Sequence, residues 1–134
     1  ISEAVYREYG APYDLAVLSA SSGWCNVLSV GWTNCMFPVL RKYPVQIFAW
    51  DAAQSLPDIA EAQDVMGVCC MTGISRRHLE FGLRNEVERD IWHALRATGG
   101  RGLILSAGAP VQPGPGMAAF FRKAVQDIGG RLGR

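Results

Sequence analysis

The residues of this chain that could do chemistry stand directly after short apolar runs, where each run gives way to a turn. Asp51 follows the run 45–50, and its carboxylate could transfer a proton, with Trp50 as a wall of the same site. A carboxylate that caps a helix or anchors a loop beside a packed tryptophan is the alternative. The pattern therefore indicates either a catalytic or a structural aspartate at a strand end.

A basic segment, Arg76-Arg77-His78, follows the turn residue Gly73. If this turn directs the chain into a site, Arg76 could bind a substrate carboxylate through two hydrogen bonds. A solvated surface loop accounts for the same residues equally well. A single histidine such as His78 is more often a packed or surface residue than a catalyst.

Three small polar residues complete the candidates for ligand binding. Ser29 and Asn34 flank the end of the first expected strand, and Ser106 follows the apolar run 103–105. No His–Asp pair accompanies Ser29 in the sequence, so a hydrolytic serine is not predicted. The Pro/Gly-rich loop 108–116 lacks both common phosphate-binding motifs, which argues against a nucleotide ligand.

The elements that must position these residues alternate between strand and helix. The apolar spacing predicts a helix over 2–21, broken at 10–12, and then four strand–helix units. The expected strands are 24–30, 45–50, 65–72 and 103–105, and the expected helices are 34–42, 56–63, 83–97 and 116–128. The expected helix ends are Thr33 or Asn34 as one N-cap, Ser55 as the next with Pro57 in the first turn, and Gly129-Gly130 as the final stop.

Alternating strands and helices predict an α/β fold with a parallel sheet, in which the run 103–105 is buried on both faces. Four units are too few to close an eight-stranded barrel, so two sheet edges would stay open. The expected architecture is therefore half of a TIM-type (β/α)8 barrel, either part of a longer barrel or paired with a second copy. A small open sheet of the flavodoxin type is the alternative.

Composition limits the classes of function. The chain has 134 residues, of which 49% are hydrophobic and 19% charged, as expected for a single globular domain over 1–134. The net charge is +1 and no basic run is present, so no nucleic-acid partner is predicted. No apolar run approaches the roughly 20 residues of a membrane helix, and no signal peptide is visible, which favours a cytoplasmic protein without a membrane partner.

The four cysteines form no C-x-x-C pair. Cys69 and Cys70 are adjacent within an apolar run, where a strand would point them to opposite faces. Reduced, buried thiols are therefore predicted rather than a disulfide framework or a zinc site.

Several segments share their order and spacing with the strand ends of a known family. They are residues 13–15, 26–29, 45–51, 56–62, 71–76 and 99–108, followed by Pro113 and Pro115. From about Tyr6 to its end, the chain resembles the C-terminal half of the uroporphyrinogen decarboxylase superfamily. That superfamily contains the haem-pathway decarboxylase and the cobalamin-dependent methyltransferases, which are built on a TIM-type barrel.

The resemblance implies a carboxy-lyase of porphyrin biosynthesis, acting on a carboxylate-bearing substrate such as a tetrapyrrole at the carboxyl ends of the strands. It implies no cofactor, because a protonated pyrrole serves as the electron sink. The candidate residues come from their positions in this chain rather than from the family pattern. Asp51 is the candidate catalytic residue, holding a pyrrole N–H or transferring a proton. The candidate substrate-binding residues are Arg76, Trp50, Ser29, Asn34 and Ser106. The expected partner is a second copy of the chain, in a homodimer, or a missing N-terminal half-barrel.

The chain departs from the family at its metal and histidine positions. Zinc methyltransferases of the family carry His-x-Cys-Gly at the end of the first of these strands. The matching positions of this chain look like Ser29-Val30-Gly31-Trp32. Their third ligand, and the histidine of the decarboxylases, both correspond to Ala109. No zinc ligand stands at these positions. Two alternatives remain beside the decarboxylase: a methyltransferase-like module that acts with a corrinoid protein, and a non-catalytic half-barrel for assembly or ligand binding.

Overall fold

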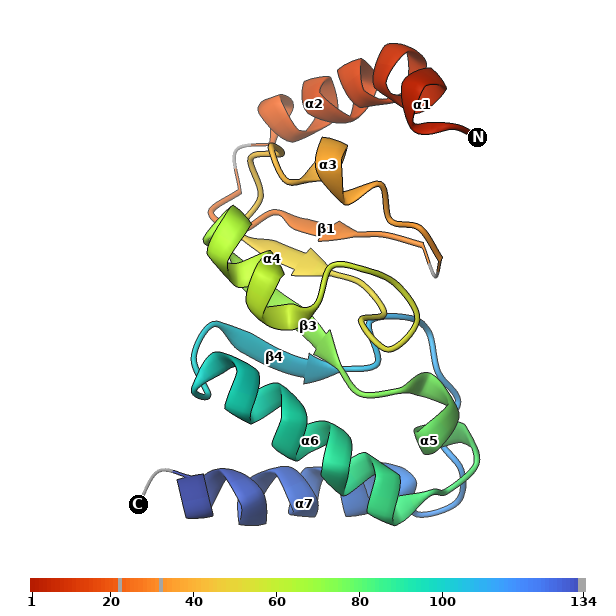
Figure 1. Cartoon of the computed structure of the whole chain (residues 1–134), viewed down its shortest axis with the longest axis vertical. Helices are drawn as coiled ribbons and strands as arrows, with labels where there is room; N and C mark the ends of the chain where they lie inside the picture. Colours follow the sequence, from red (N-terminus) through yellow and green to blue (C-terminus); the bar gives the residue numbers. More distant parts are fainter. Residues whose placement is uncertain (22, 32, 133–134) are drawn as a thin grey trace.

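Helices and strands alternate along the chain in the computed structural model, which describes residues 1–21, 23–31 and 33–132 (Figure 1). Trp32, which the family pattern includes, lies outside the described residues. The elements in chain order are α1 (Glu3–Tyr9), α2 (Ala11–Ala20), β1 (Val27–Ser29), α3 (Phe37–Leu40), β2 (Ile47–Ala49), α4 (Ile59–Met66), β3 (Cys69–Gly73), α5 (Arg76–Glu80), α6 (Arg84–Thr98), β4 (Leu103–Ser106) and α7 (Met117–Leu132).

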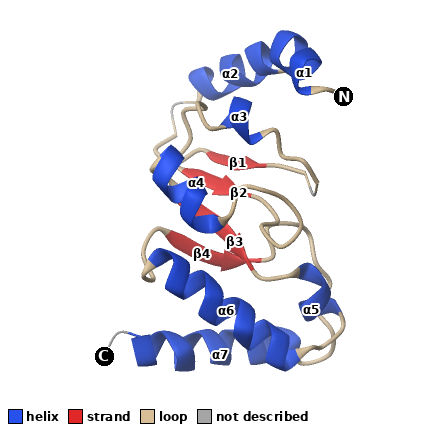
Figure 2. Ribbon diagram, in the orientation of Figure 1, coloured by secondary structure: helices blue, strands red, loops and turns tan. Residues whose placement is uncertain are grey.

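The four strands form one parallel sheet, in which the order β1-β2-β3-β4 repeats their order in the chain. Figure 2 shows the strands in red at the centre, with helices along their length and beyond both edges. The α/β class and the parallel sheet are therefore confirmed. A parallel pair needs a crossover between its strands, and α3, α4 and α6 lie in the three crossovers.

The two faces of the sheet differ in how well they are covered. The row Leu28, Phe48, Cys70 and Leu103 packs with side chains of α3, α4 and α6, and Phe48 and Cys70 are fully buried. The neighbouring rows, which point to the other face, contain Val27, Ile47, Cys69, Met71 and Ile104. We call these five residues the open face. Val27 is 51% and Ile104 41% exposed, so this face presents apolar side chains to water.

The first three strands are shorter than the sequence predicts, since β1 and β2 have three residues each and β3 has five. β4 is one residue longer than expected and ends at Ser106. The prediction that the run 103–105 is buried on both faces is wrong, because β4 lies at the edge of the sheet and Ile104 is exposed. Apolar composition alone does not distinguish an edge strand from a central one.

The helix after β1 begins later than expected. Asn34 and Met36 have left-handed backbone angles, with φ of 49° and 52°, which a continuous helix from 34 cannot contain. The N-cap is Met36, without a side-chain hydrogen bond, so the prediction that Thr33 or Asn34 caps this helix is wrong. Asn34 instead accepts a hydrogen bond from the Met36 backbone N–H at 3.4 Å through its side-chain oxygen.

The helix after β2 also begins later. Asp58 is its N-cap and accepts a hydrogen bond from the Glu61 N–H at 2.8 Å. The prediction that Ser55 caps a helix from 56 is wrong, since the Ser55 hydroxyl donates to the Asp51 carbonyl and Pro57 precedes the helix.

The C-terminal region holds two further differences and one confirmation. The short helix α5 was not predicted, and α7 continues through Gly129 and Gly130 to Leu132, so the expected stop at these glycines is wrong. The helix expected over 83–97 is confirmed as α6, whose apolar stripe Val87, Ile91 and Ala94 is fully buried. The break between α1 and α2 at Gly10 is also confirmed.

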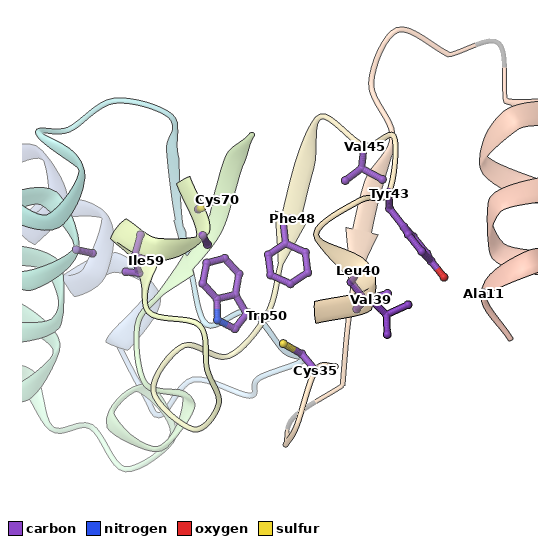
Figure 3. Close-up of a cluster of buried hydrophobic side chains, with 12 residues drawn as sticks. Ala11, Cys35, Val39, Leu40, Tyr43, Val45, Phe48, Trp50, Ile59 and Cys70 are labelled. Carbon is purple, nitrogen blue, oxygen red and sulfur yellow. The ribbon is translucent and has the colours of Figure 1, made fainter. Parts of the chain in front are cut away.

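Two hydrophobic clusters form the core. The first joins α2, α3, β2 and α4, and its centre is the ring of Phe48 stacked on Trp50 (Figure 3). The second lies around α5, α6 and α7, and includes Val87, Ile91 and Ile128. Among the described residues, no buried side-chain nitrogen or oxygen lacks a hydrogen-bond partner. Within the same residues, no helix combines the length and the apolarity needed to cross a membrane.

Candidate functional site

The parallel sheet brings the carboxyl ends of its strands, and with them most predicted site residues, to one edge. Ser29 and Ser106 are the last residues of β1 and β4. Trp50 and Asp51 follow β2, and Arg76 begins α5 shortly after β3. Figure 1 shows these ends along one side of the sheet, where the long loops and α5 also lie.

Trp50 belongs to the core. Its side chain is fully buried, its ring stacks on Phe48 at a centroid distance of 4.7 Å, and its indole N–H donates to the Pro57 carbonyl at 3.0 Å. Figure 3 shows the ring within the first cluster. Because both faces and the polar atom are engaged, Trp50 has the packed position of the structural alternative rather than that of an open site wall.

Asp51 anchors the turn that follows β2. Only 1% of it is exposed, and its carboxylate accepts hydrogen bonds from the Ala53 N–H at 3.0 Å and from the Gln54 side-chain amide at 2.7 Å. Its carbonyl oxygen accepts from the Gln54 and Ser55 backbone N–H groups. Thr72 on β3 accepts from the Ala52 N–H at 3.1 Å. Asp51 thus has the contacts of a structural residue that anchors the loop.

The loop after β4 closes over the loop after β2. Gly108 has φ of +67°, and a Cβ atom at this position would lie 1.8 Å from the Trp50 carbonyl oxygen. Only glycine permits such a contact between two backbones. The Gly108 N–H donates to the Ser106 hydroxyl at 3.1 Å, so Ser106 orders this loop, and Ala109 follows half-buried.

The remaining predicted residues lie apart from one another. Arg76 donates to Glu80 one helical turn later at 2.8 Å. Ser29 is exposed at the end of the edge strand β1, and Asn34 is exposed in the next loop. The structure therefore places the predicted residues near the carboxyl ends of the strands, as expected, without joining them into one site.

A pocket of about 430 Å³ lies at this edge, between the loop after β2 and the segment after β3. Its lining residues are Ala53, Gln54, Ser75, Arg77, His78, Phe81, Leu83 and Asp90. The pocket thus contains two neighbours of the predicted Arg76 rather than Arg76 itself.

Asp90 on α6 organises one wall of this pocket. A single carboxylate oxygen, Oδ2, accepts from the Ser75 N–H at 3.0 Å and lies 2.7 Å from Nδ1 of His78. A carboxylate only accepts hydrogen bonds, so Nδ1 carries the proton in this contact. Asp90 and Gln54 were not among the predicted residues. The only signal in the sequence was an acidic residue next to the buried stripe of α6.

The four cysteines are free thiols. Burial raises the pKa of Cys70 to about 12 and also raises that of Cys35, whose thiol donates to the Leu56 carbonyl at 2.9 Å. Across residues 1–21, 23–31 and 33–132, no three histidine, cysteine or acidic side chains gather as metal ligands would.

Comparison with known proteins gave no relative: no family model, no curated protein and no solved structure matches the chain.

Proposed function

We propose that the chain is one half of a TIM-type barrel of the uroporphyrinogen decarboxylase kind, and that it acts on a carboxylate-bearing substrate, such as a tetrapyrrole, at the carboxyl ends of its strands. The proposal is supported by a parallel sheet with its strands in chain order, helices on one face and the candidate residues at one edge. These are features of a barrel cut parallel to its axis.

The observation that carries the proposal is the open face. Val27 and Ile104 expose half or nearly half of their surface, beside the partly exposed Ile47, Cys69 and Met71. In a closed barrel the corresponding side chains point inward and fill the interior. Apolar residues on a contiguous, water-exposed face indicate a surface that a partner covers.

The free edge of β4 supports the same arrangement. A groove of about 750 Å³ runs beside this strand and is lined by apolar residues of β4 and α7, among them Leu103, Leu105, Phe121 and Val125. A further strand could pair with β4 there. The other half-barrel is supplied either by a second copy or by an N-terminal half.

The proposed reaction replaces a substrate carboxylate with hydrogen. The C–C bond to the carboxylate breaks, CO2 leaves, and the electron pair passes to a protonated pyrrole of the substrate. A proton then takes the place of the CO2. The chain would bind the substrate and supply this proton, which are tasks for cationic and proton-donating side chains at the strand ends.

The first test measures the mass of the particle in solution by light scattering across a dilution series. We expect the parent to be a dimer and Ile104→Lys to be a monomer. In the dimer, the lysine charge on the open face would be buried without an opposite charge to pair with. Val65→Lys is the matched control, since Val65 is 45% exposed and lies on α4, which packs against the opposite face of the sheet.

A second test incubates the dimer with uroporphyrinogen and follows loss of CO2 by mass spectrometry. Release of CO2 that Ile104→Lys abolishes and Val65→Lys preserves would support the proposal. A monomer at every concentration that binds no apolar dye would contradict the half-barrel. A stable dimer that binds the tetrapyrrole without changing its mass would contradict catalysis.

A further inference from the structure

One pocket at the strand ends is complete within a single chain. It is the cavity of about 430 Å³ described above, and its polar lining comes from Gln54 after β2, from Arg77 and His78 on α5, and from Asp90 on α6. The loop after β2 and the two consecutive helices after β3 therefore contribute functional groups to one space.

His78 is held in a fixed orientation in this pocket. Its Nδ1 donates to Asp90 at 2.7 Å, and the same carboxylate oxygen is held by the Ser75 backbone at 3.0 Å. With Nδ1 engaged, Nε2 is the ring nitrogen left to a molecule in the pocket. In the part of the chain that the structure describes, Nε2 forms no hydrogen bond. This nitrogen can donate to an anionic oxygen when protonated, or accept from a ligand N–H or O–H when neutral.

Arg77 supplies a positive charge to the same pocket. It is exposed, and no described acidic residue forms an ion pair with it, whereas its neighbour Arg76 pairs with Glu80. The negative charge nearest to it in the lining, on Asp90, already faces His78 and the Ser75 N–H. An arginine with free N–H groups matches the two oxygens of a carboxylate.

The lining also contains apolar side chains. Phe81 is 69% and Leu83 45% exposed, so both offer surface to a ligand. A cationic group, an oriented imidazole and an exposed aromatic ring together favour a ligand with one carboxylate on an apolar or aromatic body.

We propose that this pocket binds the carboxylate of the substrate, with Arg77 as its anchor, protonated His78 as the donor through its Nε2–H, and Asp90 as a positioning residue. The inference rests on the proposed function only for the choice of a carboxylate. It assigns the binding role to Arg77 and His78 in place of Arg76 and Asp51, whose side chains are engaged within the protein.

The test is nitrogen-detected NMR of the histidine side chains. The chain contains two histidines, His78 in the pocket and the exposed His93 on α6, so the second serves as an internal control. The probe is 3-phenylpropionate. Its uncharged amide tests whether the carboxylate is needed, and inorganic phosphate tests whether any anion suffices.

We expect 3-phenylpropionate to shift the Nε2 resonance of His78 in a saturable manner while His93 stays unchanged. Arg77→Gln should weaken this binding by about tenfold or more, since it removes a charge-assisted contact. Arg41→Gln, on an exposed arginine at the end of α3, is the matched control and should bind as the parent does.

Asp90→Asn tests the positioning role. We expect the ring-nitrogen shifts of His78 to move toward those of the unconstrained His93, with weaker probe binding, while Asp64→Asn on the exposed face of α4 changes neither. If Asp90 only stabilised the fold, Asp90→Asn would lower the unfolding midpoint without changing the tautomer of His78.

Three results would overturn the inference: equal shifts of both histidines, equal binding of the amide, or binding unchanged in Arg77→Gln. Stronger binding of phosphate than of the carboxylate would assign the pocket to a different anion. Because the probe and the readout need neither dimerisation nor CO2 release, binding without turnover would contradict the proposed reaction and leave the pocket assignment standing.

Discussion

The contact between Gly108 and the Trp50 carbonyl makes a sharp prediction about stability. Gly108→Ala places a methyl group 1.8 Å from the Trp50 carbonyl oxygen, which is the nearest atom, and 2.8 Å from the Asp51 nitrogen. Both distances lie below the 3.0 Å that Cβ atoms keep from their neighbours, and the obstacle is backbone on a buried residue. The loop after β4 must therefore move away from the loop after β2.

The expected cost has two parts. A side chain at φ of +67° costs about 1–2 kcal/mol in the left-handed region. Forcing the two loops apart adds about 1–3 kcal/mol, as for other overpacked sites. Gly116→Ala isolates the first part, because Gly116 has φ of +73° and no atom would lie within 4 Å of its Cβ.

The assay is urea unfolding followed by tryptophan fluorescence and circular dichroism, from which the free energies of unfolding of both variants and the parent are obtained. We expect Gly108→Ala to be less stable than Gly116→Ala by about 1–3 kcal/mol. Equal losses in the two variants would refute the close approach of the two loops.

Three further predictions concern buried polar groups. Asp51→Ala should lower the free energy of unfolding by about 2–4 kcal/mol, because the Ala53 N–H and the Gln54 amide lose their acceptor. Asp51→Asn should lose less than half as much stability. Equal losses of the two variants in urea unfolding would contradict the role of Asp51 as a loop anchor. Burial, assisted by the hydrogen bond to Asp14, raises the pKa of Tyr6 above its ordinary 10.0, so the unfolded chain ionises first and stability is lost as the pH rises above about 10. Tyr6→Phe should lose less stability than the parent between about pH 9 and 11 in the same assay, and an identical pH dependence would count against this cause. Since burial raises the pKa of Cys70 to about 12, iodoacetamide should label the half-buried Cys25 before Cys70 in the folded protein, and mass spectrometry showing the reverse order would disprove the protection of Cys70.

The elements with a strong repeating pattern could be predicted from the sequence. The stripe Val87, Ile91 and Ala94 located α6 within one residue at each end, because three buried positions at helical spacing leave little freedom. The short strands were located only approximately, since three or four apolar residues do not fix where pairing starts. The predicted start of α4 was wrong because the side chain of Asp58, rather than that of Ser55, accepts a hydrogen bond from a backbone N–H of the first turn.

The site was predictable in position but not in composition. Parallel strands guarantee that Asp51 and Arg76 lie at the same edge, as observed. The contact between His78 and Asp90 depends on α5 folding back against α6, and α5 itself was not predicted. The engagement of Asp51 with Gln54 is equally a property of the folded turn, because nothing in the residue types distinguishes an anchor from a catalyst.

The sheet order has a consequence for how the chain acquires its structure. Each strand pairs only with its predecessor and its successor, so native contacts can form as the polypeptide emerges from the ribosome, without waiting for a distant segment. Most members of the first cluster, from Ala11 to Ile59, precede β3 and can assemble first. The growing sheet then serves as a template on which each later strand docks, in the manner of a solenoid extending by one repeat at a time.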